Sequence, residues 1–313
     1  MNFVERLKNI LLPKDVVVIG YYFFLTIIIF IFYNSIANAL LLITLNFCLI
    51  FSVIWIANKA EITKNKILEI IHFYYVIPLI FITFKEIYFI ISSVHTQDYD
   101  NLLIKIDRFI FGGDPTVFLN QFANPLLTEI LQIAYATFFF LPIILGVEYH
   151  LKGEHNKFQF IIFSTVLGFF LSYIGYLLLP AIGPRFTLHS FEMTNTELPG
   201  LFLTDILREI VNWGESIPAG TPNPIEAVQR DVFPSGHTQM TLIIMYLSVK
   251  LNSRNKIFFL IDGSLLIFAT VYLRYHYVTD LIGGMVFMIL TMVLGKFIFN
   301  WWRKKQKKPI LEY

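Results

Sequence analysis

Long apolar runs constrain this chain more than any other feature of its sequence. A helix needs about 20 mostly apolar residues to cross a membrane, and several stretches of the 313-residue chain approach or exceed that length. We count eight, at residues 16–33, 36–57, 67–92, 127–147, 158–180, 237–250, 256–273 and 281–302. The runs lack the period-two alternation of an outer-membrane barrel. We therefore predict an all-α integral membrane protein with about eight transmembrane helices.

Composition supports the same class. Hydrophobic residues make up 56% of the chain and charged residues 15%, against about 45–50% and about 25% in soluble domains. The single cysteine, Cys48, cannot form an intrachain disulfide and does not indicate a redox compartment. The first apolar run lacks a small-residue cleavage site, so we expect no cleavable signal peptide.

The distribution of basic residues predicts the topology. If the N-terminus is cytoplasmic and the chain crosses eight times, 16 of its Lys and Arg residues lie inside and six lie outside. This bias follows the positive-inside rule, and Trp301 and Trp302 before the final lysine cluster are typical of an interfacial anchor. We expect both termini to be cytoplasmic and the segments 93–126 and 181–236 to lie on the outer (periplasmic, extracellular or lumenal) face.

These two outer segments differ in character. Residues 93–126 contain Leu103, Ile106 and Ile110 at helical spacing, which suits either a helix in the membrane interface or an ordinary loop. Residues 181–236 are richer in Pro, Gly, Asn and Glu than the rest, and we predict a loop there.

Three short segments concentrate the polar residues, and the topology places all three at the outer membrane boundary. They are LLLPAIGPRF at 177–186, DVFPSGHTQ at 231–239 and LRYHYVTDLIGG at 273–284. Ionisable residues at membrane depth are costly and usually functional. We therefore predict that these segments form one site.

The middle segment has the features of a helix start that binds an anion. Ser235 is a good N-cap, and Gly236 lets a ligand approach the backbone closely. Free N–H groups and the helix dipole then favour an oxyanion, with His237 on the first helical turn. A solvent-bonded histidine at a helix end is the alternative.

The outer two segments supply a His–Asp pair and two arginines. His276 and Asp280 are four residues apart, a spacing that makes them neighbours on a helix, and a carboxylate beside an imidazole fixes its tautomer. Arg274 can offer a planar fork to phosphate oxygens. Arg185, after Gly183, can do the same or can snorkel to the membrane surface.

Together the segments resemble the type-2 phosphatidic acid phosphatase superfamily of lipid phosphatases and phosphotransferases. PSGH at 234–237 matches the second motif of that superfamily, and His276 with Asp280 matches the end of the third. Leu178 stands where the first motif normally has lysine, and Thr270 where the third normally has arginine. The sequences GPRF, FPSGHT, HYVTD and IDRFIFGGDP look more like the inositol phosphorylceramide synthase branch.

The resemblance implies a fold and a mechanism. A six-helix catalytic core would occupy residues 67–313, preceded by two further transmembrane helices in residues 1–66. His276 would attack phosphorus to form a phosphohistidine, Asp280 would orient it, and His237 would act as general acid and base. The implied phosphate-binding residues are Arg185, Ser235, Gly236 and Arg274.

We therefore predict a membrane enzyme that acts on a lipid phosphoester. An alcohol acceptor would make it a phosphotransferase of the inositol phosphorylceramide synthase type, which we favour. Water would make it a phosphatase of phosphatidic acid or a polyprenyl (pyro)phosphate.

Two other classes compete with this prediction. An anion or lipid transporter would suit the helix count, but repeated broken helices are missing. A zinc hydrolase could use His237, His276 and Asp280 as ligands, although Arg274 would repel a metal. We expect no metal, no cofactor and no nucleic-acid partner.

Overall fold

A computed structural model describes residues 3–312, and every regular element within that range is helical. Within residues 3–312, five helical segments are long and apolar enough to cross a membrane, and the number rises to six if α8 (Pro125–Ala136) and α9 (Phe140–Leu151), bent by 50°, count as one span. The five are α2 (Pro13–Ile31), α3 (Ala39–Thr63), the pair α4 (Lys66–Tyr74) and α5 (Val76–Val94), α10 (His155–Leu178) and α17 (Val278–Lys305). The prediction of an all-α membrane protein is confirmed.

The other two predicted spans are shorter helices. α15 (Gly236–Lys250) has 15 residues and α16 (Lys256–Tyr272) has 17, below the length that usually crosses a bilayer. Each predicted apolar run therefore lies on a helix or a helix pair, while the number of eight spans stays a prediction.

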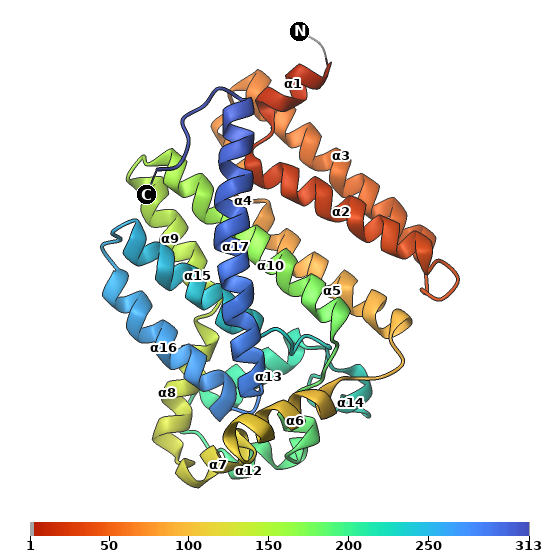
Figure 1. Cartoon of the computed structure of the whole chain (residues 1–313), viewed down its shortest axis with the longest axis vertical. Coiled ribbons are helices and arrows are strands. Elements are labelled where there is room, and N and C mark those ends of the chain that lie inside the picture. Colours follow the sequence, from red (N-terminus) through yellow and green to blue (C-terminus); the bar gives the residue numbers. More distant parts are fainter. Residues whose placement is uncertain (1–2, 313) are drawn as a thin grey trace. The chain divides into compact units, whose positions relative to one another are not determined.

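The chain divides into two compact units, and the first combines segments from both ends. It comprises the described residues up to Thr96, Tyr149–Phe170 and those from Leu290 onward. After the short α1 (Phe3–Ile10), α2 and α3 pack side by side (Figure 1). At the start of α2 the buried Asp15 accepts hydrogen bonds from Tyr75 Oη at 2.8 Å and Lys14 Nζ at 3.0 Å. The first unit therefore contains α4 and α5 as well as the N-terminal helices. The predicted boundary between the two N-terminal helices and the catalytic core was at residue 66.

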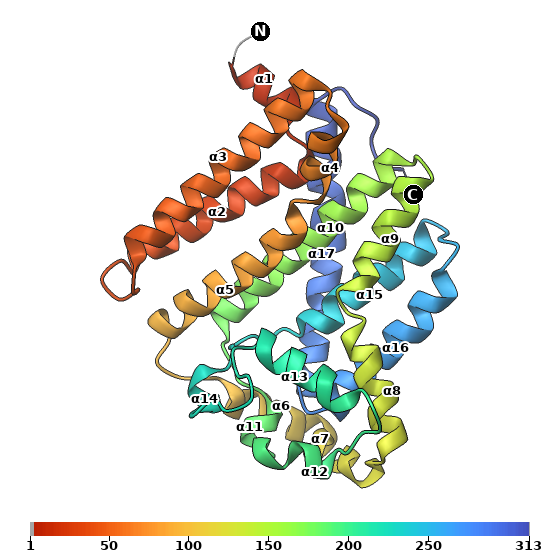
Figure 2. The ribbon, with the colours of Figure 1, turned by 180° about the vertical axis from the view of Figure 1, so that it is seen from behind.

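The second unit, Gln97–Glu148 and Leu171–Ile289, contains all three polar segments. Its helices α15 and α16 pack as a hairpin, and α8 packs against α16. Its short helices gather at one end in both views (Figures 1 and 2). They are α6 (Asp100–Phe111), α7 (Pro115–Leu119), η1 (Asn120–Phe122), α11 (Pro184–Thr187), η2 (Phe191–Met193), α12 (Thr194–Glu197), α13 (Thr204–Gly214) and α14 (Pro224–Ala227).

These short helices can be compared with the predictions for the two outer segments, 93–126 and 181–236. Residues 93–126 do contain a helix, α6, which buries Leu103 and Asp107 and leaves Phe109 91% exposed. The prediction of a loop over 181–236 is wrong in part, because this segment contains α13 and four single-turn helices. The Pro and Gly residues that suggested a loop lie mainly between these helices, for example at Pro199, Gly200 and Pro218.

Candidate active site

The three polar segments converge on one small pocket in the second unit. Arg185 comes from the first segment, His237 from the second and His276 from the third. The other lining residues are Tyr135, Ile182, Glu215, Asp231, Val232 and Tyr275. Ser235, Gly236, Arg274 and Asp280 do not line it, and their contacts are described below.

His237 owes its position to the start of α15. Ser235 is the N-cap, and its Oγ accepts a hydrogen bond from the Thr238 N–H at 3.2 Å, so the predicted cap is confirmed. His237 is the second residue of the helix. Its ring centroid lies 4.5 Å from that of Tyr135, 4.1 Å from that of Phe138 and 5.7 Å from that of His276. Two imidazoles therefore stand at one pocket, and aromatic packing holds that of His237 in place.

Gly236 and the Ser235 backbone serve the protein's own packing. A Cβ atom on Gly236 would lie 2.3 Å from the Tyr176 hydroxyl, so a larger residue there would displace that hydroxyl. The Ser235 N–H donates to the Asp280 carbonyl at 2.9 Å. In this structure the close contact at Gly236 and the Ser235 N–H thus seat α15 against Tyr176 and the start of α17, while phosphate binding by Ser235 and Gly236 stays a prediction.

His276 lies in the loop between α16 and α17, and Asp280 lies in the first turn of α17, so the pair does not share a helix. His276 Nδ1 is 3.1 Å from the Val232 carbonyl oxygen and 3.5 Å from Asp280 Oδ2. Asp280 Oδ2 accepts a hydrogen bond from the Tyr277 N–H at 2.8 Å. Because a carbonyl oxygen can only accept, Nδ1 carries the proton and the lone pair is on Nε2. The Val232 carbonyl has no side-chain signature, and the sequence did not indicate it.

The environment of His276 keeps its imidazole neutral. Burial lowers the pKa of His276 to about 3, the hydrogen bond to the Val232 carbonyl opposes that decrease, and the positive charge of Arg185 adds to it. A histidine normally titrates near pH 6.5. At neutral pH the Nε2 lone pair is therefore available to attack an electrophile.

Arg185 is the one Lys or Arg among the residues that line the pocket. Two residues before it, Gly183 has a φ of +93°, a conformation that favours glycine. A Cβ atom added at this position would lie 2.9 Å from the Tyr275 carbonyl oxygen. The guanidinium carbon lies 5.0 Å from the Tyr275 ring centroid. Nη1 donates to Asn212 Oδ1 at 3.2 Å, and Nη2 forms an ion pair with Glu215. The cation is thus fixed by neighbours from α13 and its C-cap.

Arg274 lies elsewhere, contrary to the role expected from the sequence. Its side chain is fully buried, with Nη1 bonded to Glu197 at 2.5 Å and Nη2 to Asn120 Oδ1 at 2.6 Å. The residue has a φ of +68°, and its carbonyl accepts the Arg185 N–H at 3.1 Å. The guanidinium therefore ties the His276 loop to η1 and α12, and the backbone supports Arg185.

Two aspartates on α6 connect the segments that carry Arg185 and His276. Asp100 accepts hydrogen bonds from the Ile182 N–H at 3.0 Å, the Gly183 N–H at 2.8 Å and the Tyr277 hydroxyl at 2.8 Å. Asp107 accepts from the first two N–H groups of α17, at 2.9 and 2.8 Å, where the helix dipole favours an anion. Neither aspartate was predicted from the sequence, although seven-residue spacing places them on one face of a helix.

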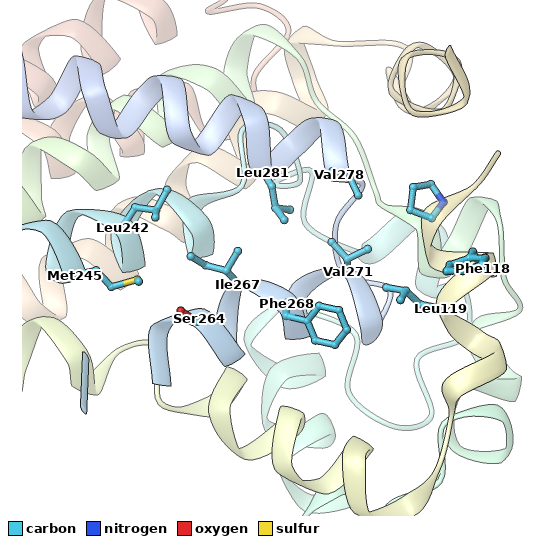
Figure 3. Close-up of a pocket in the computed structure, with 11 residues that line it drawn as sticks. Phe118, Leu119, Leu242, Met245, Ser264, Ile267, Phe268, Val271, Val278 and Leu281 are labelled. Carbon is cyan, nitrogen blue, oxygen red and sulfur yellow. The ribbon is translucent and has the colours of Figure 1, made fainter. Parts of the chain in front are cut away.

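An apolar groove lies in the same unit, between α7, α15, α16 and the start of α17 (Figure 3). α15 carries His237 in its first turn, and Val278 and Leu281 of the groove flank Asp280 on α17. Ser264 contributes the one polar side chain of the lining. The lining residues are Pro115, Phe118, Leu119, Leu242, Met245, Ser264, Ile267, Phe268, Val271, Val278 and Leu281.

Comparison with known proteins bears on this site. The sequence model of the PAP2 superfamily matches residues 101–294, a range that contains all three polar segments and all of α6 except Asp100. A PA-phosphatase related-family protein of Dictyostelium discoideum is 23% identical over 230 residues, which cover 64% of this chain and 40% of that protein. The chain thus spans less than half the length of that relative. No solved structure matches the chain.

Proposed function

Because the chain belongs to the PAP2 superfamily, whose sequence model matches more than half of it, we propose that it transfers a phosphate or phospho-head group from a lipid phosphoester through a phosphohistidine. The observation that carries this proposal is the pocket itself. His237 and His276 stand there with ring centroids 5.7 Å apart, beside one guanidinium.

The geometry supports a two-step displacement. In the first step His276 Nε2 forms a bond to phosphorus, the bond to the leaving oxygen breaks, and His237 donates a proton to that oxygen. Arg185 binds the equatorial oxygens, whose charge grows in the transition state. In the second step His237 takes a proton from the acceptor, which attacks phosphorus and releases His276. Asp280 and the Val232 carbonyl orient His276 throughout.

We favour an alcohol over water as the acceptor, which makes the protein a phosphotransferase of the inositol phosphorylceramide synthase type. The GPRF, FPSGHT and HYVTD sequences and the missing cations at Leu178 and Thr270 support this choice. The alternative is a phosphatase of phosphatidic acid or a polyprenyl (pyro)phosphate. The test is a lipid-product assay on the purified protein with and without candidate alcohol acceptors, both lipid and sugar alcohols. A new phospho-product that requires the alcohol would support transfer, whereas release of inorganic phosphate alone would support hydrolysis.

The same assay separates the proposal from a zinc hydrolase. In residues 3–312 no three His, Cys, Asp or Glu side chains are grouped as a metal site requires. We therefore expect product formation to survive a chelator. Loss of activity in EDTA that zinc restores would overturn this part of the proposal.

The charge distribution supports a site on the outer face and cytoplasmic termini. In a Cys48→Ala background, a cysteine at the exposed Thr196 should react with an impermeant maleimide from the outer side only. A cysteine at the exposed Lys64 should react only after the cytoplasmic side is opened. Thr196→Cys labelled only from the cytoplasmic side would reverse the topology.

We further propose that the apolar groove holds a hydrocarbon chain of the lipid substrate. Ser264→Trp should fill the groove and raise KM for a long-chain lipid about tenfold, equivalent to losing about two buried methylenes at about 0.8 kcal/mol each. A short-chain soluble ester should be unaffected. Leu265→Trp is the matched control, because Leu265 is its exposed neighbour and does not line the groove. Equal effects of the two variants on both substrates would argue against chain binding there.

A further inference from the structure

The pocket carries an unusual charge balance for a phosphate site. One guanidinium, Arg185, lines it together with two carboxylates, Glu215 and Asp231. The position that normally supplies a lysine in the first motif is Leu178, whose side chain is 65% exposed. Before any substrate binds, two carboxylates thus stand against one guanidinium among the lining side chains.

Glu215 is held in place by its own segment. It is the C-cap of α13, its N–H donates to the Val211 carbonyl at 2.9 Å, and its carbonyl accepts the Gln229 N–H at 3.3 Å. Its carboxylate pairs with Arg185 Nη2, and the two side chains are only 15% and 5% exposed. Solvent and salt therefore screen this pair weakly. The segment 181–236, which had no assigned role, delivers both carboxylates to the pocket.

We propose that Glu215 is a specificity-determining residue that selects the charge of the phosphate group, and this inference rests on the function proposed above. A guanidinium has five N–H donors, so Arg185 can hold Glu215 and a phosphate oxygen together. The pair then offers directed hydrogen bonds with little net positive charge. A phosphodiester with one negative charge is accepted, whereas a phosphomonoester, which carries about −1.5 to −2 at pH 7, is repelled by Glu215 and Asp231. The site thus favours a phosphodiester head group.

The test uses two esters with the same leaving group, p-nitrophenyl phosphate and methyl p-nitrophenyl phosphate. At pH 8 the monoester is a dianion, since its second pKa lies near 6, and the diester stays a monoanion. Glu215→Gln should shift the ratio of kcat/KM values toward the monoester by at least tenfold, about 1.4 kcal/mol. Because the ratio is compared between variants, the intrinsic reactivities of the two esters cancel. An unchanged ratio in an active Glu215→Gln protein would overturn the proposal.

Two control variants separate the effect of the Glu215 charge from an effect on the position of Arg185. Glu215→Asp retains the carboxylate and should retain the wild-type ratio. Asn212→Ala removes the neutral partner of Arg185 and should change both substrates alike. If Asn212→Ala moved the ratio as far as Glu215→Gln does, the position of Arg185 and not its neutralisation would set the preference.

A binding measurement tests the role of Glu215 without requiring turnover. The wild-type protein should bind dimethyl phosphate at least tenfold more tightly than dianionic methyl phosphate, and Glu215→Gln should narrow that gap. If the wild type turns over neither ester, the proposed function fails, yet these dissociation constants still test Glu215. Tighter binding of the dianion by the wild type would overturn the role of Glu215 even if Glu215→Gln did not fold.

Discussion

His276→Ala should abolish turnover and prevent any covalent phosphoenzyme, because Nε2 of His276 is the atom that attacks phosphorus in the proposed mechanism. We expect kcat to fall by on the order of 10⁴-fold or more, as is seen when a covalent nucleophile is removed. His237→Ala should behave differently. With a poor leaving group it should cost about 10²- to 10⁴-fold, but with p-nitrophenol as leaving group an acid is less needed. Rapid quenching with a ³²P-labelled p-nitrophenyl ester should therefore trap a phosphoenzyme in the His237→Ala variant and none in the His276→Ala variant.

His189 supplies the matched control for these two substitutions. It belongs to the same unit, its Nε2 contacts Thr116 Oγ1 at 3.0 Å, and it does not line the catalytic pocket. His189→Ala should therefore keep most of the activity. Identical behaviour of His276→Ala and His237→Ala with the activated ester would remove the basis for assigning one as nucleophile and the other as acid.

Arg185→Lys should lower kcat/KM at least tenfold, about 1.4 kcal/mol of transition-state binding. Arg185 is the one cation that lines the pocket, and a lysine ammonium cannot reproduce a planar fork that holds Asn212, Glu215 and a phosphate at once. The ester substrates described above measure this loss. The midpoint of thermal unfolding should change little, because the shorter side chain keeps its charge beside Glu215.

Arg274→Lys is the comparison that separates the two arginines. Because its guanidinium bridges Glu197 and Asn120 and is fully buried, we expect a lower unfolding midpoint and a smaller loss of kcat/KM than for Arg185→Lys. The Arg274 carbonyl that supports Arg185 remains in this variant. The opposite ranking, with kcat/KM reduced mainly by Arg274→Lys and a normal unfolding midpoint, would restore Arg274 as a phosphate ligand.

Features that depend on residues close together in the chain could be predicted from the sequence alone. Apolar run length fixed the all-helical membrane class, because a lipid environment forces backbone hydrogen bonds to be satisfied within each segment. The Ser235 cap and the start of α15 followed from local hydrogen bonding. His237 and His276 were found because their motifs are short and contiguous, and the structure places both at one pocket.

The contacts that these residues make could not be predicted in this way, because the partners come from remote parts of the chain. Nothing local distinguishes Arg185 from Arg274, since the difference lies in Glu215 and Asn212 for one and Glu197 and Asn120 for the other. The Val232 carbonyl at His276 and the α6 carboxylates at both loops are equally remote in sequence. An arginine or a histidine takes its role from the charges and acceptors that packing brings to it, and those contacts join segments tens of residues apart.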